Sequence, residues 1–419
     1  MTQPAPEFKI TIDSAGLERR IDELAQISES PAPVVTRVLF SEADLRGREY
    51  VRKAARDAGL VIREDAVGNI FARWAGSEPG LPAVGSGSHT DAIPNAGRYD
   101  GVIGVLGAFE ALAALKRAGF KPRRSLEVVM FTAEEPTRFG LGCLGSRLMA
   151  GSIPLEKAHA LRDREGRSLD ELREAAGYKG TLESVKLPNG YYHSFVELHI
   201  EQGPILEKEN IPIGLVEHIA GPSSYRVTLH GEGGHAGAVL MPVRHDAMLA
   251  GAEIALAVES AAKGSGSPDT VGTVGVFRIE PGAVNSVPFR AYLEIDLRDA
   301  RLDSRAKALA EIRAAAAAAC ARRGVTMKFE EINADPPAAG DSATVDIAEK
   351  VCAELGLRSL RMVSRAYHDS LFMSRVSPTT MIFIPCHNGW SHRPEEYSTT
   401  AHIASGAEVL AHTMARLAL

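Results

Sequence analysis

Apolar and polar positions in the N-terminal third of the chain alternate between helical and strand periods. Residues 49–58 and 102–118 carry apolar side chains at helical spacing, and each run ends at a glycine. Residues 81–88 and 125–131 are short apolar runs, which is typical of strands buried on both faces. Strand, helix and strand joined by short links predict an α/β fold with a mostly parallel central sheet. Ligands bind such sheets beyond the carboxyl ends of the strands.

The pattern changes near residue 216, where a compact α+β unit is predicted. Its expected strands and helices are 225–230, 270–279, 290–299, 246–262 and 304–323. After Asp335 the pattern of helix, strand and loop returns. We therefore predict one domain made of residues 1–215 and 331–419, interrupted by an inserted domain of residues 216–330.

Composition narrows the class of protein. Lys and Arg number 47 against 53 Asp and Glu, a net charge of −6, which does not favour nucleic acid as a partner. Residues 1–13 lack the apolar core of a secretory signal. The longest run of small apolar residues, 314–319, is far shorter than the ~20 residues that span a bilayer. The four cysteines are scattered and form no Cys-x-x-Cys pair. We expect a cytoplasmic globular protein without membrane or nucleic-acid partners.

Two candidate metal ligands follow the predicted strand 81–88. Asp91 comes two residues after His89, and a metal-bound imidazole usually donates its second N–H to such an acceptor. His89 could equally be a hydrogen-bonded loop residue. Asp100 opens a glycine-rich helix, where it could cap the helix or bridge two cations.

An acid pair, Glu134 and Glu135, follows the apolar strand 125–131. Adjacent carboxylates resist joint ionisation unless a cation offsets them. One could bind metal while the other acts as general base. The alternative is a solvated pair in a loop.

Two further histidines lie in polar surroundings. His199 shares one face of a strand with Glu197 and Glu201, which is typical of a ligand or of the outer face of an edge strand. His392 lies in a turn-rich loop after the strand 381–385. Imidazole and carboxylate ligands without a thiolate fit zinc, manganese, cobalt or nickel.

The sequence closely resembles the metallopeptidase-like family of amidases, hydantoin-pathway carbamoylases and ureide amidohydrolases. The matching stretches include GSHTDAIPNAGRYDGVIGVLG (87–107), FTAEEPTRFGLGCLGSRLMAG (131–151), ELHIEQGPILE (197–207), GGHAGAVLMP (233–242), PGAVNSVPF (281–289), AYHDSLF (366–372) and SHRPEEYS (391–398). The resemblance implies a metallopeptidase-like catalytic domain with an inserted α+β lid that also forms a homodimer.

The resemblance also implies two metal ions per subunit. One would take His89, Asp100 and His199, and the other Asp100, Glu135 and His392. Asp91 would orient His89. Glu134 would accept a proton from a water molecule activated by the metals, and the resulting hydroxide would attack an amide or ureido carbonyl.

Four further residues match family positions that contact substrate. His235 corresponds to a histidine that reaches an active site across the dimer and stabilises the oxyanion. Asn285 and Arg298 correspond to residues that hold the substrate carboxylate, and Gln202 to a polar contact in the cleft. The guanidinium of Arg298 suits a carboxylate because it binds bidentately, although it could instead pair with a neighbouring aspartate on its own strand. Asn285 could equally be a turn residue.

His368 is a further candidate contact to substrate, or part of a structural pair with Asp369. Pro136 after the acid pair and the stretch 364–373 look most like the ureidoglycolate-type members of the family. The favoured substrate is therefore a ureido acid of purine breakdown, ureidoglycolate or allantoate, and the alternative is an N-carbamoyl-L-amino acid. A metal-free binding protein on the same scaffold would require loss of a ligand or of the base, and all six residues are present.

Overall fold

A computed structural model describes residues 9–419, and the chain forms two compact units. The first unit contains the described residues up to Glu217 together with Ala339–Met362 and His368–Leu419. The second contains His218–Ala338 and Val363–Tyr367. Residues 331–338, expected in the interrupted domain, lie in the second unit, where residues 331–334 belong to a strand that pairs along that unit's sheet. Residues 1–8 of the predicted first domain lie outside the described residues.

The first unit is built on a nine-stranded sheet in the order β15-β8-β17-β7-β4-β6-β3-β2, with β16 paired to β8. Its four middle strands, β17, β7, β4 and β6, run parallel, whereas β8 and β3 pair antiparallel with their neighbours. The predicted α/β class is confirmed, and the sheet is mixed because antiparallel strands flank its parallel centre. The strands are β2 (Val61–Glu64), β3 (Ile70–Trp74), β4 (Ala83–His89), β6 (Leu126–Phe131), β7 (Tyr192–Ile200), β8 (Ile213–Ile219), β15 (Ala338–Ala339), β16 (Ser359–Ser364) and β17 (Thr379–Ile384).

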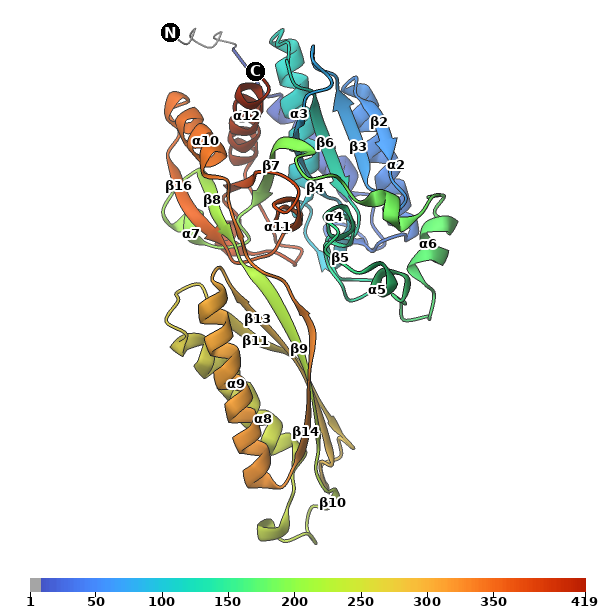
Figure 1. Cartoon of the computed structure of the whole chain (residues 1–419), viewed down its shortest axis with the longest axis vertical. Helices are drawn as coiled ribbons and strands as arrows, with labels where there is room; N and C mark the ends of the chain where they lie inside the picture. The colour runs from blue at the N-terminus through green and yellow to red at the C-terminus, as the bar shows by residue number, and fades with distance from the viewer. Residues whose placement is uncertain (1–8) are drawn as a thin grey trace. The chain divides into compact units, whose positions relative to one another are not determined.

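Helices cover both faces of this sheet (Figure 1). Strand β6 shows why its sequence is apolar throughout: Val128 and Met130 enter one core, while Val129 and Phe131 enter the other. The first core includes α1, α3, α10 and α12, and the second includes α4, α5 and α6. The helices are α1 (Ser14–Ala25), α2 (Glu42–Asp57), α3 (Val102–Arg117), α4 (Leu144–Met149), α5 (Leu155–His159), α6 (Leu169–Ala175), α7 (Ile205–Lys208), α10 (Ser342–Glu354), α11 (Asp369–Met373) and α12 (Thr400–Leu417).

Shorter elements complete the first unit. The two-stranded sheet of β1 (Val35–Arg37) and β5 (Ala92–Ala96) lies outside the main sheet. Within the described residues, no helix is both long and apolar enough to cross a membrane.

The second unit is an antiparallel sheet in the order β11-β13-β9-β14 with two long helices packed on it. Strand β13 alternates strictly, and its buried side chains, Ala291, Leu293, Ile295 and Leu297, join the core beneath the helices. A small two-stranded antiparallel sheet, β10 with β12, lies beyond one end of the main sheet of this unit (Figure 1). The elements are β9 (Gly221–His230), β10 (Gly234–His235), β11 (Val271–Glu280), β12 (Ser286–Val287), β13 (Arg290–Asp299), β14 (Thr326–Ala334), α8 (Ala247–Gly264) and α9 (Leu302–Arg323).

Candidate metal centre

The parallel strands of the first unit bring the predicted ligands to one edge of the sheet. His89 is the last residue of β4 and pairs in register with Phe131, the last residue of β6. His199 is the penultimate residue of β7, which runs parallel to β4 on its other side. Glu135 follows the end of β6, and His392 lies in the loop after β17. Because these strands point the same way, their carboxyl ends meet, as expected for an α/β ligand site.

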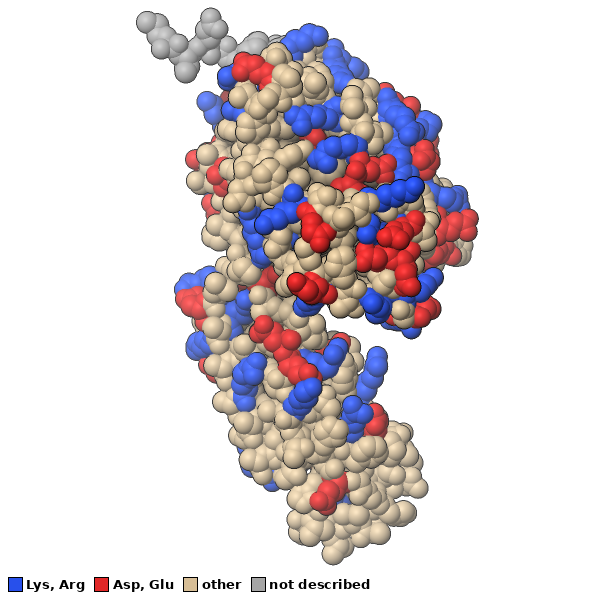
Figure 2. Space-filling view, turned by 45° about the vertical axis from the view of Figure 1, so that its right-hand side comes forward, with Lys and Arg blue, Asp and Glu red and all other residues tan. Residues whose placement is uncertain are grey.

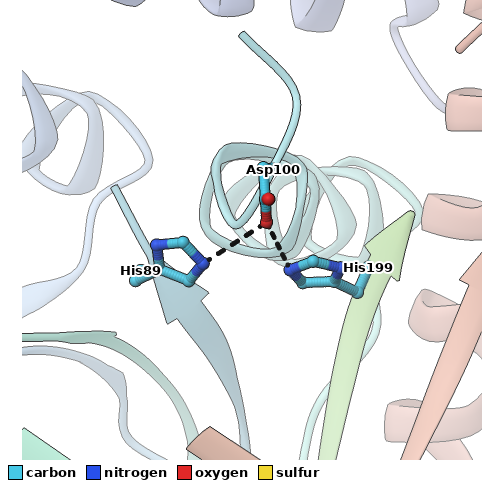
Figure 3. Close-up of side chains that lie close together, drawn as sticks. All are labelled: His89, Asp100 and His199. Carbon is cyan, nitrogen blue, oxygen red and sulfur yellow. Dashed lines mark ion pairs between the residues drawn. The ribbon is translucent and has the colours of Figure 1, made fainter. Parts of the chain in front are cut away.

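Asp100 lies at the centre of this cluster, at the start of α3 (Figure 3). Its Oδ1 is 3.6 Å from Nε2 of His89 and 3.1 Å from Nε2 of His199. Its Oδ2 is 3.3 Å from Nε2 of His392, and that nitrogen is 3.2 Å from Oε1 of Glu135. The two carboxylate oxygens of one aspartate therefore face two separate groups of potential ligands.

Backbone geometry sets the approach of Asp100. The N-cap of α3 is Gly101, and no side chain caps this helix, so the capping alternative for Asp100 is wrong. Gly101 has a φ of 66°, and a Cβ built there would lie 2.4 Å from ring atoms of His89. Only glycine allows the backbone to turn this close to the imidazole.

Hydrogen bonds orient two of the imidazoles. Nδ1 of His89 lies 3.0 Å from the backbone carbonyl oxygen of Asp91, and Nδ1 of His199 lies 2.9 Å from that of Ile200. A proton on each Nδ1 would satisfy these carbonyls and leave each Nε2 lone pair facing Asp100. The carboxylate of Asp91 instead accepts the backbone N–H groups of Glu134 and Glu135, at 3.3 and 3.1 Å. Asp91 thus links the His89 strand to the acid pair.

The acid pair is buried, so the solvated-loop alternative is wrong. Oε1 of Glu135 faces His392. Oε2 of Glu134 lies 3.8 Å from Nε2 of His89, and its Oε1 lies 3.5 Å from the sulfur of Cys143. Burial, opposed in part by His89, raises the pKa of Glu134 well above its usual value. The two glutamates therefore occupy different environments despite being adjacent in sequence.

The carboxylates of the cluster favour protonated histidines in the absence of a metal. Burial lowers the pKa of His89, but Glu134 and Asp100 outweigh burial and raise it well above its usual value. Hydrogen bonds to Asp100 and Glu135 raise the pKa of His392 to about 11. Burial raises the pKa of Asp100, yet the surrounding histidines hold it well below its usual value. Protons thus occupy positions that a divalent cation would take, and metal binding would release them.

The donor set fits a divalent metal. Both groups consist of imidazole nitrogens and carboxylate oxygens, with no thiolate among them. Such ligands suit hard or borderline divalent ions. A third potential group, Glu197 with His199 and His368, has its carboxylate occupied by the hydroxyls of Ser88 and Ser370, at 2.7 and 2.6 Å.

Strand β7 is central, so the edge-strand alternative for His199 is wrong. Glu197 is fully buried on it. His368 is buried too, and its ring meets that of His199 at a centroid distance of 4.5 Å in an edge-on arrangement. The ring of His368 therefore packs against that of a candidate ligand, His199. Gln202 also contacts the cluster, since its Nε2 donates to Oδ2 of Asp100 at 2.8 Å.

One supporting residue was missed in the sequence. Glu396 is buried, and its Oε1 accepts the backbone N–H groups of Tyr99 and Asp100 at 2.8 and 3.0 Å. Its Oε2 accepts the hydroxyl of Ser391, the neighbour of His392. Glu396 thus ties the Asp100 loop to the His392 loop. The stretch SHRPEEYS contained this residue, but nothing local distinguished it from the adjacent Glu395.

The remaining predicted residues lie in the second unit. His235 forms β10, where it is exposed and pairs with Ser286, and the backbone N–H of Ala236 donates to the carbonyl of Asn285. Arg298 lies near the carboxyl end of β13, whereas β10 and β12 lie near its amino end. Its guanidinium binds Asp296 through two hydrogen bonds of 2.7 and 3.2 Å and lies over the ring of Tyr367.

Comparisons with known proteins identify the family. The chain is 55% identical over 415 residues to a ureidoglycolate hydrolase of Oryza sativa subsp. japonica, covering 97% of this chain and 85% of that protein. It is 37% identical over 412 residues to an N-carbamoyl-L-amino acid amidohydrolase of Geobacillus stearothermophilus, covering 97% and 99%. The crystal structure of AtUAH in complex with glyoxylate matches with a TM-score of 0.91 and 52% identity over 98% of both chains.

These relatives are amidohydrolases, so the predicted enzyme class, a hydrolase of C–N bonds, is confirmed. Hydrolases of the matching family bind divalent metals, in agreement with the donor set described above. The family model, described as Peptidase family M20/M25/M40, matches residues 85–416 and so includes all five candidate ligands. The chain therefore belongs to peptidase family M20/M25/M40.

Proposed function

We propose that this protein is a two-metal amidohydrolase that cleaves the carbamoyl C–N bond of ureidoglycolate. The similarity to a ureidoglycolate hydrolase at 55% identity supports this substrate over an N-carbamoyl-L-amino acid, for which the corresponding identity is 37%. Glyoxylate, named in the similar crystal structure, is the acid that remains once both nitrogens have left ureidoglycolate. Allantoate, a related ureido acid, is a second candidate substrate in the same class.

The position of Asp100 carries the two-metal proposal. Its Oδ1 faces His89 and His199, and its Oδ2 faces His392 on the side of Glu135. A bridging carboxylate is the usual means of holding two cations ~3.5–4 Å apart. We assign one site to His89, Asp100 and His199 and the other to Asp100, Glu135 and His392, with zinc or manganese as the favoured ions and cobalt or nickel as alternatives.

Glu134 is proposed as the general base. When bound, the divalent ions acidify a water molecule and polarise the ureido carbonyl. Oε2 of Glu134 faces the metal centre and can accept the proton of that water and return it to the leaving nitrogen. The water oxygen joins the ureido carbon, and the bond from this carbon to the nitrogen of the glycolate half breaks. Carbamate and hydroxyglycine result, and they decompose to carbon dioxide, glyoxylate and two molecules of ammonia.

Five residues are proposed to contact the substrate. Arg298 would bind its carboxylate, and this requires the guanidinium to share or exchange its present partner, Asp296. Asn285 would add a hydrogen bond, and His235 would stabilise the oxyanion. Gln202 presents a buried Oε1 without a hydrogen-bond partner, and His368 lies behind His199. Gln202 and His368 belong to the first unit, and the other three belong to the second.

The distance between Arg298 and the pair formed by His235 and Asn285 is an argument for a homodimer. At least eight residues of extended strand, from Arg290 to Arg298, separate them, which corresponds to about 27 Å. A small ureido acid cannot touch both ends of this sheet at once. We propose that one subunit supplies Arg298 to a site and that the partner subunit supplies His235 and Asn285.

The surface around β10 agrees with a role in contact between subunits. The end of the second unit that carries β10 shows few charged side chains (Figure 2). Large apolar side chains are exposed there, among them Leu240, Met241, Val243 and Val284. Clustered apolar residues on a surface usually mark an interface.

An ammonia-release screen tests the proposed function. Purified protein loaded with zinc, manganese, cobalt or nickel would be given ureidoglycolate, allantoate and several N-carbamoyl-L-amino acids. We expect the highest kcat/KM on ureidoglycolate and two bound ions per subunit by elemental analysis. A preference for N-carbamoyl-L-amino acids would establish the alternative activity. Absence of both bound metal and turnover under every condition would instead indicate a binding protein.

A further inference from the structure

Cys143 contacts the proposed base, Glu134. Cys143 is fully buried at the N-cap of α4 and has a φ of 55°, a left-handed conformation that few non-glycine residues adopt. From this position its backbone N–H donates to the carbonyl of Glu134 at 2.8 Å. The next two N–H groups, of Leu144 and Gly145, donate to the carbonyls of Ala133 and Thr132. The start of α4 thus binds the backbone of the acid loop.

The thiol of Cys143 reaches the side chain of the same residue. Its sulfur is 3.5 Å from Oε1 of Glu134, whereas Oε2 faces His89 and the metal centre. Burial and the nearby Glu134 carboxylate raise the pKa of the thiol well above its usual value, so the sulfur keeps its proton. The neutral thiol is therefore a hydrogen-bond donor to one carboxylate oxygen, which leaves the other free.

Two buried side chains, Ser146 and Asp369, lie next to the left-handed turn at Cys143. The hydroxyl of Ser146 lies 3.2 Å from the carbonyl oxygen of Cys143 and 2.5 Å from Oδ1 of Asp369. Both Ser146 and Asp369 are fully buried, and Asp369 begins α11. A continuous chain of contacts therefore runs from α11 through Ser146 and Cys143 to Glu134.

We infer that Cys143 is a positioning residue whose thiol fixes the orientation of Glu134, so that Oε2 points towards the reacting water. This inference rests on the proposed role of Glu134 as general base. Cys143 is not itself a nucleophile, because it is fully buried and its thiol is directed at a carboxylate. Its contribution is to keep one rotamer of Glu134 populated during turnover.

Substitution separates this role from simple packing. We expect Cys143→Ala to lower kcat about tenfold, which is the effect of one lost hydrogen bond, with KM and metal content unchanged. Cys143→Ser keeps a donor and should recover most of that loss. Cys352→Ala is the matched control, because Cys352 is also fully buried but lies in α10 within the opposite core. A kcat within twofold of wild type for Cys143→Ala, or equal losses for the alanine and serine variants, would overturn the inference.

A second measurement does not need turnover. The S–H stretching band of Cys143, assigned by its disappearance in Cys143→Ser, should move to higher frequency in Glu134→Gln, because an amide accepts a weaker hydrogen bond than a carboxylate. An unmoved band would contradict the contact even if Cys143→Ala does not fold. If the wild-type protein hydrolysed none of the ureido acids, the proposed function would be refuted. The spectroscopic test of the contact between Cys143 and Glu134 could still be carried out.

Discussion

The candidate residues of the two units differ in how firmly their surroundings hold them. Around Asp100, hydrogen bonds from buried side chains and backbone groups orient His89, Asp100 and His199, whereas the more exposed His392 contacts only Asp100 and Glu135. In the second unit, His235 lies exposed on a two-residue strand and Arg298 binds an aspartate of its own strand. The comparison indicates that the fold holds the candidate metal ligands close together, whereas the candidate substrate-binding groups of the second unit are held by fewer contacts.

Glu134→Gln should have the largest effect and the clearest bearing on this contrast. The amide cannot accept a proton from water, so we expect kcat to fall by about 10³-fold. Metal content should be unchanged, because Glu135 rather than Glu134 belongs to the ligand groups. Turnover and elemental analysis on the same sample would check both points. Near-normal turnover would remove Glu134 as the base.

Arg298→Ala tests the second unit. Loss of charge-assisted hydrogen bonds to a carboxylate should lower kcat/KM by about 100-fold, mainly through KM, while metal content stays the same. Arg226→Ala is the matched control, because Arg226 also binds an acid of the same sheet, Glu294. Similar values of kcat/KM for both variants would show that Arg298 only forms a structural ion pair within the sheet.

Glu396→Ala tests whether hydrogen bonds between neighbouring loops increase the metal affinity of the candidate site. We expect metal affinity to fall by about 10–100-fold, as is usual when a hydrogen-bonding partner of a ligand is removed. Glu395→Ala changes the adjacent residue, whose carboxylate forms only an exposed ion pair with Arg393. Titration of the apo forms with manganese would compare them. Equal affinities would mean that Asp100 needs no such support.

Metal removal should give the most local effect, because both groups of candidate ligands belong to the first unit. Ions at about 1,000 times their dissociation constant stabilise the folded state by about 4 kcal/mol. Chelation should therefore speed amide hydrogen exchange in β4, β6 and β7 but not in β9 or β13. Equal acceleration in both units would show that the metal centre also stabilises the second unit.

Hydrophobic periodicity predicted the long elements well. The helix expected at 102–118 is Val102–Arg117, and the strand expected at 290–299 is Arg290–Asp299. The helix expected from residue 49 begins at Glu42, with Ser41 as its N-cap. Helix α1, a 12-residue helix that buries Leu17, Ile21 and Leu24, was not predicted.

The proximity of His89, Glu135 and His392 followed from their places at or after the ends of parallel strands. Their hydrogen-bond partners did not follow, because these contacts join distant parts of the chain. Glu396 binds the backbone of Tyr99 across 297 positions, and the thiol of Cys143 meets Glu134 through a left-handed turn. No local pattern distinguishes such an acid or thiol from its neighbours. The roles of individual side chains in the second unit remain proposals for the same reason.

The way in which the second unit is inserted has a consequence for how such a chain can diversify. The backbone N–H of Gly340 donates to the carbonyl of Glu217 in the first unit, and that of Asp335 donates to the carbonyl of Pro222 in the second. The chain therefore leaves and re-enters through two adjacent strands. The long segment His218–Ala338 can therefore be lengthened at its loops without rethreading the sheet that holds the candidate ligands, although residues 363–367 also belong to the second unit. Changes in that segment can thus accumulate without altering the residues of the candidate metal centre.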